Sequence, residues 1–113
     1  MREVLHLGPL SVDALEAAAD FHARLLPSIE ATLLGGADPL TLVFLPAGSN
    51  QETHAHRAWR LAAVQGLARR YAPSRVNAIE SDDPVAIAAA QEWLDDAGGV
   101  TGQLLPLNGT GAD

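Results

Sequence analysis

Residues 100–109 read Val-Thr-Gly-Gln-Leu-Leu-Pro-Leu-Asn-Gly, an apolar run enclosed by glycines. Such a run predicts a short buried strand that is entered and left by tight turns. The chain before it alternates between apolar runs of strand length and longer segments with helical spacing. Read backwards from this last strand, the chain therefore predicts the order β-α-β-α-β-α-β.

Three earlier apolar runs have the length and composition of strands. The first, 4–7, is stopped by Gly8-Pro9, and the second, 40–45, is apolar on both faces, as a central parallel strand should be. The third covers 75–79. Each is followed by a segment long enough for a helical crossover.

Three helices are predicted between these strands. The first covers 12–34, where apolar residues recur at three- and four-residue spacing, and Pro27 inside it predicts a kink. The second covers 52–72 and ends before a proline. The third starts within Ser81-Asp82-Asp83-Pro84, which supplies a carboxylate cap and a proline at the first helical position, and it stops at Gly98-Gly99.

This alternation predicts an α/β fold of the Rossmann-like, three-layer α/β/α type. The sheet has four parallel strands, the crossovers are right-handed, and helices cover both faces. We expect one domain over residues 1–109 and a flexible tail over residues 110–113.

Composition restricts the function. The net charge of −7 argues against nucleic acid or an anionic membrane as a partner, because both attract clustered Lys and Arg. The chain has no cysteine, which excludes thiolate metal sites and cysteine nucleophiles. The N-terminus has neither a basic region followed by an apolar core nor an apolar run of spanning length, so we expect a cytoplasmic protein.

Three segments resemble the short-chain dehydrogenase/reductase family. Residues 72–79 resemble the segment that leads into the family's sixth strand. Residues 83–94 are similar to its late helix, and Thr101-Gly102-Gln103 to Asn108-Gly109 resemble its final strand. Leu5-His6-Leu7-Gly8 also lies where the family has an Asn-Asn-Ala-Gly strand end. The resemblance implies the C-terminal half of the family fold.

The resemblance also predicts what the chain lacks. The family binds its dinucleotide at a glycine-rich turn, and by this alignment the chain starts after that turn, so no NAD(P) site is expected unless a partner chain supplies it. The family's catalytic Tyr and Lys correspond to Thr53 and Arg57, and its serine falls near Ala47, with Ser49 as a shifted substitute. Thr cannot replace a phenol of tuned acidity, and Arg is not a compact ammonium.

The weak catalytic candidates are His6, Ser49 and Arg57, and each has a structural alternative. His6 is placed at the carboxyl end of a strand, where α/β sheets bind ligands, although a histidine there is often structural. His54 and His56 suggest a metal, but residues two apart face different sides of a helix, so a solvated helix start is favoured and no metal site is expected. A hydrolase triad of Ser49, His54 and an acid lacks the nucleophile-elbow pattern.

These observations favour a non-catalytic subunit. We expect it to form a homodimer, or a hetero-oligomer with a full-length short-chain reductase, through the helices over 12–34 and 52–72, which in the family form a dimer contact. The alternative is an enzyme: either a reductase component (3-oxoacyl or ketone type) completed by a partner chain, or a repurposed small-molecule site at the carboxyl ends of the strands. A ligand-binding module is a third possibility.

Overall fold

The computed structural model describes residues 1–107 of the chain. The tail predicted over 110–113, together with Asn108 and Gly109, lies outside the described residues. Within them the strands are β1 (Glu3–His6), β2 (Leu40–Phe44), β3 (Val76–Glu80) and β4 (Leu104–Pro106). They form one sheet in the order β1-β2-β3-β4, and every neighbouring pair is parallel. The predicted four-stranded parallel sheet is confirmed.

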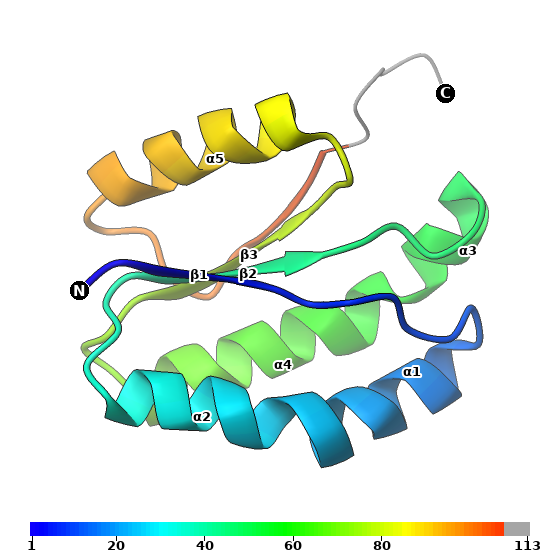
Figure 1. Ribbon diagram of the computed structural model, residues 1–113, viewed down its shortest axis with the longest axis horizontal. Coiled ribbons are helices and arrows are strands. Elements are labelled where there is room, and N and C mark those ends of the chain that lie inside the picture. Colours follow the sequence, from blue (N-terminus) through cyan, green and yellow to red (C-terminus); the bar gives the residue numbers. More distant parts are fainter. Residues whose placement is uncertain (108–113) are drawn as a thin grey trace.

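Helices cover both faces of this sheet, as predicted (Figure 1). One face carries α1 (Ala14–Asp20), the π-helical turn η1 (Phe21–Leu25), α2 (Leu26–Leu34) and α4 (Arg57–Arg70). The other face carries α5 (Pro84–Asp96). The short helix α3 (Asn50–Ala55) follows the exit loop of β2, beyond the carboxyl end of the sheet.

The helix predicted over 12–34 is continuous from Ala14 to Leu34, and it contains a π-turn just before Pro27. At the end of η1 the Leu26 amide donates to the Phe21 carbonyl, five residues back. Pro27, which has no amide hydrogen, follows directly in the first turn of α2. The turn inserts one residue, so Phe21 and Ile29 both remain fully buried on the sheet side.

The helix predicted over 52–72 is divided in two. α3 ends at Ala55 and α4 begins at Arg57, with His56 between them. The ring of His56 is fully buried, with its Nε2 2.8 Å from the Val12 carbonyl and its Nδ1 3.1 Å from Trp59 Nε1. A carbonyl and an indole N–H allow only one arrangement, in which Nε2 donates and Nδ1 accepts.

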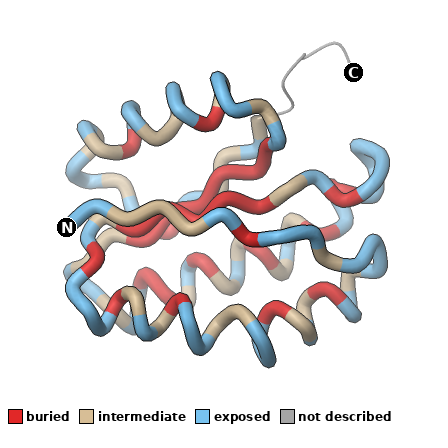
Figure 2. The backbone as a smooth tube through the Cα atoms, viewed as in Figure 1, coloured by how far each residue is buried: buried red, intermediate tan, exposed pale blue. Residues whose placement is uncertain are grey.

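The buried residues lie in the strands and on the inward faces of the helices (Figure 2). Alternate residues of β2 and β3 serve two cores, one on each face of the sheet. Leu42 and Ala78 pack with Phe21 and Val64 on the α1–α4 side, whereas Val43 and Ile79 pack with Ile87 and Leu94 on the α5 side. Among the described residues, no helix is both long enough and apolar enough to cross a membrane.

The Thr101-Gly102-Gln103 segment attaches β4 to β3 through side chains as well as backbone. Thr101 Oγ1 accepts from the Val76 amide at 3.0 Å, and Asn77 both donates to the Val100 carbonyl and accepts from the Gln103 amide. Gly102 has φ 74°, a conformation that suits glycine. This stretch therefore sets the register of the last strand before its short ladder begins.

Candidate functional site

A buried ion-pair network lies at the carboxyl end of β3. Glu80 is the last residue of that strand and is 1% exposed. One carboxylate oxygen accepts from Arg57 Nε at 2.9 Å and the other from Arg60 Nη1 at 2.8 Å. Because Arg57 and Arg60 are three residues apart on α4, both guanidinium groups lie on the same side of the helix and reach the same carboxylate.

Arg60 is as deeply buried as its partner. Its Nη2 donates to the Leu45 carbonyl at 3.1 Å, and its guanidinium lies 4.7 Å from the centre of the Phe44 ring. Within residues 1–107 its Nε has no hydrogen-bond partner. Burial lowers the pKa of Arg60 below its ordinary value, while the hydrogen bond and charge of Glu80 oppose this shift. The guanidinium nevertheless stays charged, so this end of the sheet holds a fixed cation with its counter-ion.

Arg57, at the position that the resemblance assigns to the catalytic lysine, is held by this network. Its side chain is 28% exposed, and Nη1 lies 3.2 Å from His54 Nδ1. Thr53, at the tyrosine position, is buried, and its Oγ1 accepts from the Ala47 amide at 2.8 Å. A hydrogen bond therefore joins the positions aligned with the family's Ser and Tyr, whereas the residue at the Lys position is paired with Glu80.

The three catalytic candidates, His6, Ser49 and Arg57, have different surroundings. Ser49 is the N-cap of α3: its hydroxyl accepts from the Glu52 amide, and the Glu52 carboxylate accepts from the Ser49 amide. The hydrogen bond from the Ser49 backbone amide, followed by the interaction of the carboxylate with the Ser49 hydroxyl, lowers the pKa of Glu52. His6 is exposed and lines a cavity on the α5 side. Within residues 1–107 no hydrogen bond or ion pair joins His6, Ser49 and Arg57 to one another.

His54 and His56, which were expected to lie in a solvated helix start, have different surroundings. His54 is exposed, as expected, but His56 is fully buried, so for His56 the prediction was wrong. Its burial depends on the Val12 carbonyl, which belongs to a loop 44 residues earlier in the chain. Among the residues that the structure describes, no three His, Asp or Glu side chains are grouped so as to hold a metal ion.

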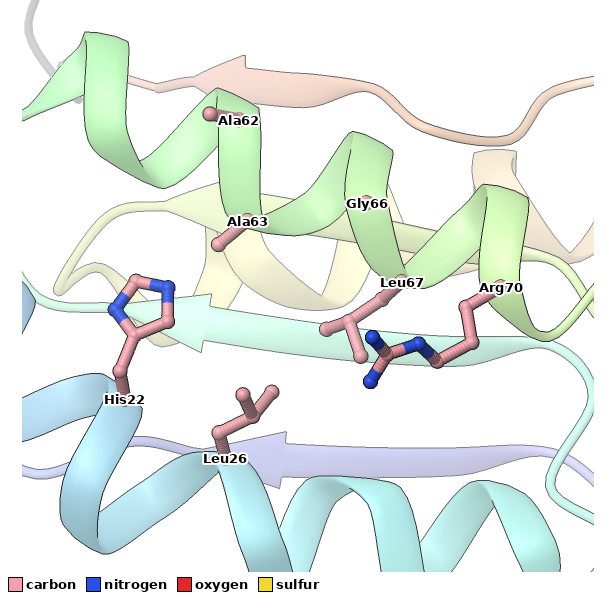
Figure 3. A pocket seen from close by; sticks show the side chains of 7 residues that line it. All are labelled: His22, Leu26, Ala62, Ala63, Gly66, Leu67 and Arg70. Atoms are coloured by element: carbon pink, nitrogen blue, oxygen red, sulfur yellow. The ribbon is translucent and has the colours of Figure 1, made fainter.

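A groove of about 190 Å³ lies on the outer surface between η1, α2 and α4 (Figure 3). His22 and Leu26 line one side. The α4 side has small residues, Ala62, Ala63 and Gly66, and the side chains of Leu67 and Arg70 reach the same space. His22 is exposed, and its Nδ1 is 2.7 Å from the Ala18 carbonyl.

A larger cavity, of about 510 Å³, lies on the opposite face of the sheet. His6 and Val43, which are register partners in β1 and β2, line it together with Leu45 beyond the end of β2. The first two turns of α5 supply Ile87 and Ala88. This volume lies within the range of small-molecule sites, roughly 300–1,000 Å³.

Arg60 is the main site residue that the sequence analysis did not single out. Its signal was present: it follows Arg57 at a spacing that shares a helix face, and an acidic residue ends an otherwise uncharged strand segment. What the sequence could not supply was the direction of the Glu80 side chain. Strand alternation places Glu80 on the face of Val76 and Ala78, toward α4.

The described fold is a parallel α/β sheet of the Rossmann-like class, with its polar network at the carboxyl ends of the strands. A family model described as "Short chain dehydrogenase-like protein" (SDR-like) matches residues 5–107. The chain therefore belongs to the SDR-like family. No curated protein and no solved structure gives a significant match to it.

Proposed function

We propose that this SDR-like chain is a non-catalytic subunit that self-associates, or assembles with a full-length short-chain reductase, through its long helices. The surface in question comprises α1, η1 and α2, predicted over 12–34, and α4, predicted within 52–72. The observation that carries the proposal is the groove between these helices, whose α4 side is built from small residues. Small side chains allow another helix to approach closely.

Two further features support assembly without catalysis. The first is the number of exposed large apolar residues in the 12–34 segment, which includes Val12, Leu15 and Leu34. The second is the Glu80 network. The cation at the lysine position is already neutralised by a buried carboxylate, and the Thr53 hydroxyl already accepts a backbone hydrogen bond. An aliphatic hydroxyl is also far less acidic than a phenol, and a guanidinium does not give up its proton, so neither group is suited to move a substrate proton.

The test compares two exposed alanines on opposite faces of the molecule. Ala62→Arg places a long cation in the groove, and Ala89→Arg places the same side chain on α5. We expect the wild-type chain and Ala89→Arg to be oligomeric by light scattering at micromolar concentration, and Ala62→Arg to be monomeric. A wild-type monomer would exclude the homomeric form of the proposal. The heteromeric form would then require that the wild-type chain co-purifies with a short-chain reductase and that Ala62→Arg does not.

A second candidate is an enzyme or a binding site, either completed by a partner chain or repurposed at the carboxyl ends of the strands. The cavity beside His6 favours it, because ligands of parallel α/β sheets bind at this edge. If the chain alone holds a dinucleotide, NADH or NADPH will raise its Tm by several degrees through mass action. An unchanged Tm with either nucleotide restricts this candidate to a partner-supplied cofactor or to another ligand.

A further inference from the structure

The cavity between α5 and the carboxyl ends of β1 and β2 shows which kind of molecule it would hold. The inference rests on the second candidate function and is independent of assembly, because the cavity and the groove lie on opposite faces of the sheet. The cavity floor is apolar and buried, with Leu7 at 6% exposed, Val43 at 1% and Ile87 at 8%. An apolar group that covers this floor removes apolar surface from water, which is favourable.

The rim of the cavity is polar, and its one carboxylate determines the charge preference. Asp82, His6 and Gln91 line the cavity, and no Lys or Arg does. The amino end of α5 also lies here, and a helix amino end is where such folds bind phosphate. In this chain, however, that end is capped by Asp83, whose carboxylate accepts from the Val85 amide at 3.0 Å. Two successive carboxylates at that position repel an anion.

We infer that this cavity binds a small, predominantly apolar molecule without negative charge, with its apolar body on Val43 and Ile87 and any polar group at the rim. Apolar contact with the floor supplies the affinity, and the carboxylate of Asp82 supplies selection against phosphates, sulfonates and carboxylates. A nucleotide is therefore a poor occupant of this space.

A matched pair of dyes tests the inference, because they differ only by an anionic group. Phenylnaphthylamine is uncharged, and anilinonaphthalene sulfonate carries the same rings with a sulfonate. We expect the uncharged dye to bind with increased fluorescence and the sulfonate to bind about tenfold more weakly, as apolar burial is similar and repulsion is added. Asp82→Asn should reduce this preference at least about twofold, because it removes one full charge at the rim.

Substitutions at two adjacent alanines locate the dye. Ala88 lines the cavity and Ala89 does not, yet both are exposed on α5. Ala88→Trp should weaken binding of the uncharged dye about tenfold by occupying the space, while Ala89→Trp leaves it unchanged. If circular dichroism shows that Ala88→Trp is misfolded, Gln91→Trp replaces it at the same cavity.

Three outcomes would overturn the inference. These are no binding of the uncharged dye, equal or tighter binding of the sulfonate, and loss of binding in Ala62→Trp instead of Ala88→Trp. The last outcome would place the dye in the groove on the other face. The assembly proposal is tested separately, by the oligomeric state of Ala62→Arg. Its failure is therefore distinguishable from failure of the dye-binding inference.

Discussion

Glu80 is the residue on which the electrostatic arrangement at the end of the sheet depends. It is the counter-ion of both Arg57 and Arg60, and the side chains of Glu80 and Arg60 are 1% and 2% exposed. A buried pair contributes little compared with an apolar replacement, but removing one partner leaves a buried charge without compensation. The network is therefore more sensitive to single substitution than to joint replacement.

Glu80→Gln should lower the free energy of unfolding by about 3–5 kcal/mol, because it leaves Arg60 charged and unpaired in the core. Urea unfolding followed by circular dichroism measures the loss. Asp20→Asn, which breaks the exposed pair between Asp20 of α1 and Arg24 of η1, is the control and should change little. Equal effects of the two substitutions would contradict a special role for the buried network.

The ionisation of the Glu30 carboxyl group should make the stability of the fold depend on pH. The hydroxyl of Tyr71, followed by the guanidinium of Arg70, holds the pKa of Glu30 below its ordinary value of 4.5. A depressed carboxylate pKa contributes stability that is present above the ordinary value and is lost as pH falls through the folded-state value. The stability difference between wild type and Glu30→Gln should therefore be largest near neutral pH and vanish in acid.

Urea midpoints at about pH 7 and about pH 3 measure this difference. Tyr71→Phe removes the largest cause of the lowered Glu30 pKa while keeping the aromatic ring. The stability difference between wild type and Tyr71→Phe should therefore show part of the same pH dependence. A constant difference between wild type and Glu30→Gln across the range would mean that the charge of Glu30 is not what links α2 to α4.

Among the elements, the strands were predictable because their signals are local. Apolar runs between glycines and prolines placed β1, β2 and β3 within two residues of their observed bounds. The break in the predicted 52–72 helix was not predictable, because His56 is held by the Val12 carbonyl in a distant loop. The π-turn was missed for a related reason: Pro27 marks an irregular helix but does not say where the extra residue lies.

The candidate site also has features that the sequence could predict and features that it could not. The sequence placed His6 at the carboxyl end of a strand, and topology alone brings the carboxyl ends of parallel strands to one edge of the sheet. It could not show that the Ser49 hydroxyl caps α3 or that Glu80 faces α4, because both facts depend on which side of an element a side chain leaves. The position of a residue along the chain predicts that it lies at the carboxyl edge of the sheet. The direction of its side chain decides which groups it contacts there.

The cap of α5 offers a prediction at the scale of one helix. Asp83 accepts from the Val85 amide, whereas its neighbour Asp82 is not the capping residue and is exposed. Asp83→Ala should lower the free energy of unfolding by about 1 kcal/mol, because a first-turn amide loses its acceptor. Asp82→Ala is the control and should be close to wild type in thermal or urea unfolding. The reverse order of the two effects would contradict the assigned cap.

At the scale of the whole molecule, the sheet separates two surfaces with different properties. The α1–α4 side carries the groove of small residues and the α5 side carries the cavity with the acidic rim. The two sides nevertheless share strands, because consecutive residues of β2 and β3 point into opposite cores. A ligand on one side and a partner on the other would therefore both stabilise the same sheet.

This sharing predicts that both sides unfold in one transition. Trp59 packs against the core of the α1–α4 side and Trp93 lies on α5, so Trp93→Phe leaves a probe of one side and Trp59→Phe a probe of the other. For each variant, the urea transition followed by tryptophan fluorescence should coincide with that followed by circular dichroism, as expected for a cooperative domain of this size. Each variant serves as its own reference, so any stability cost of removing the partly buried Trp59 does not affect the comparison. If Trp93 fluorescence changes at lower urea than the circular dichroism signal, α5 detaches from a sheet that remains folded, and binding in the cavity could then be regulated independently of the helical surface.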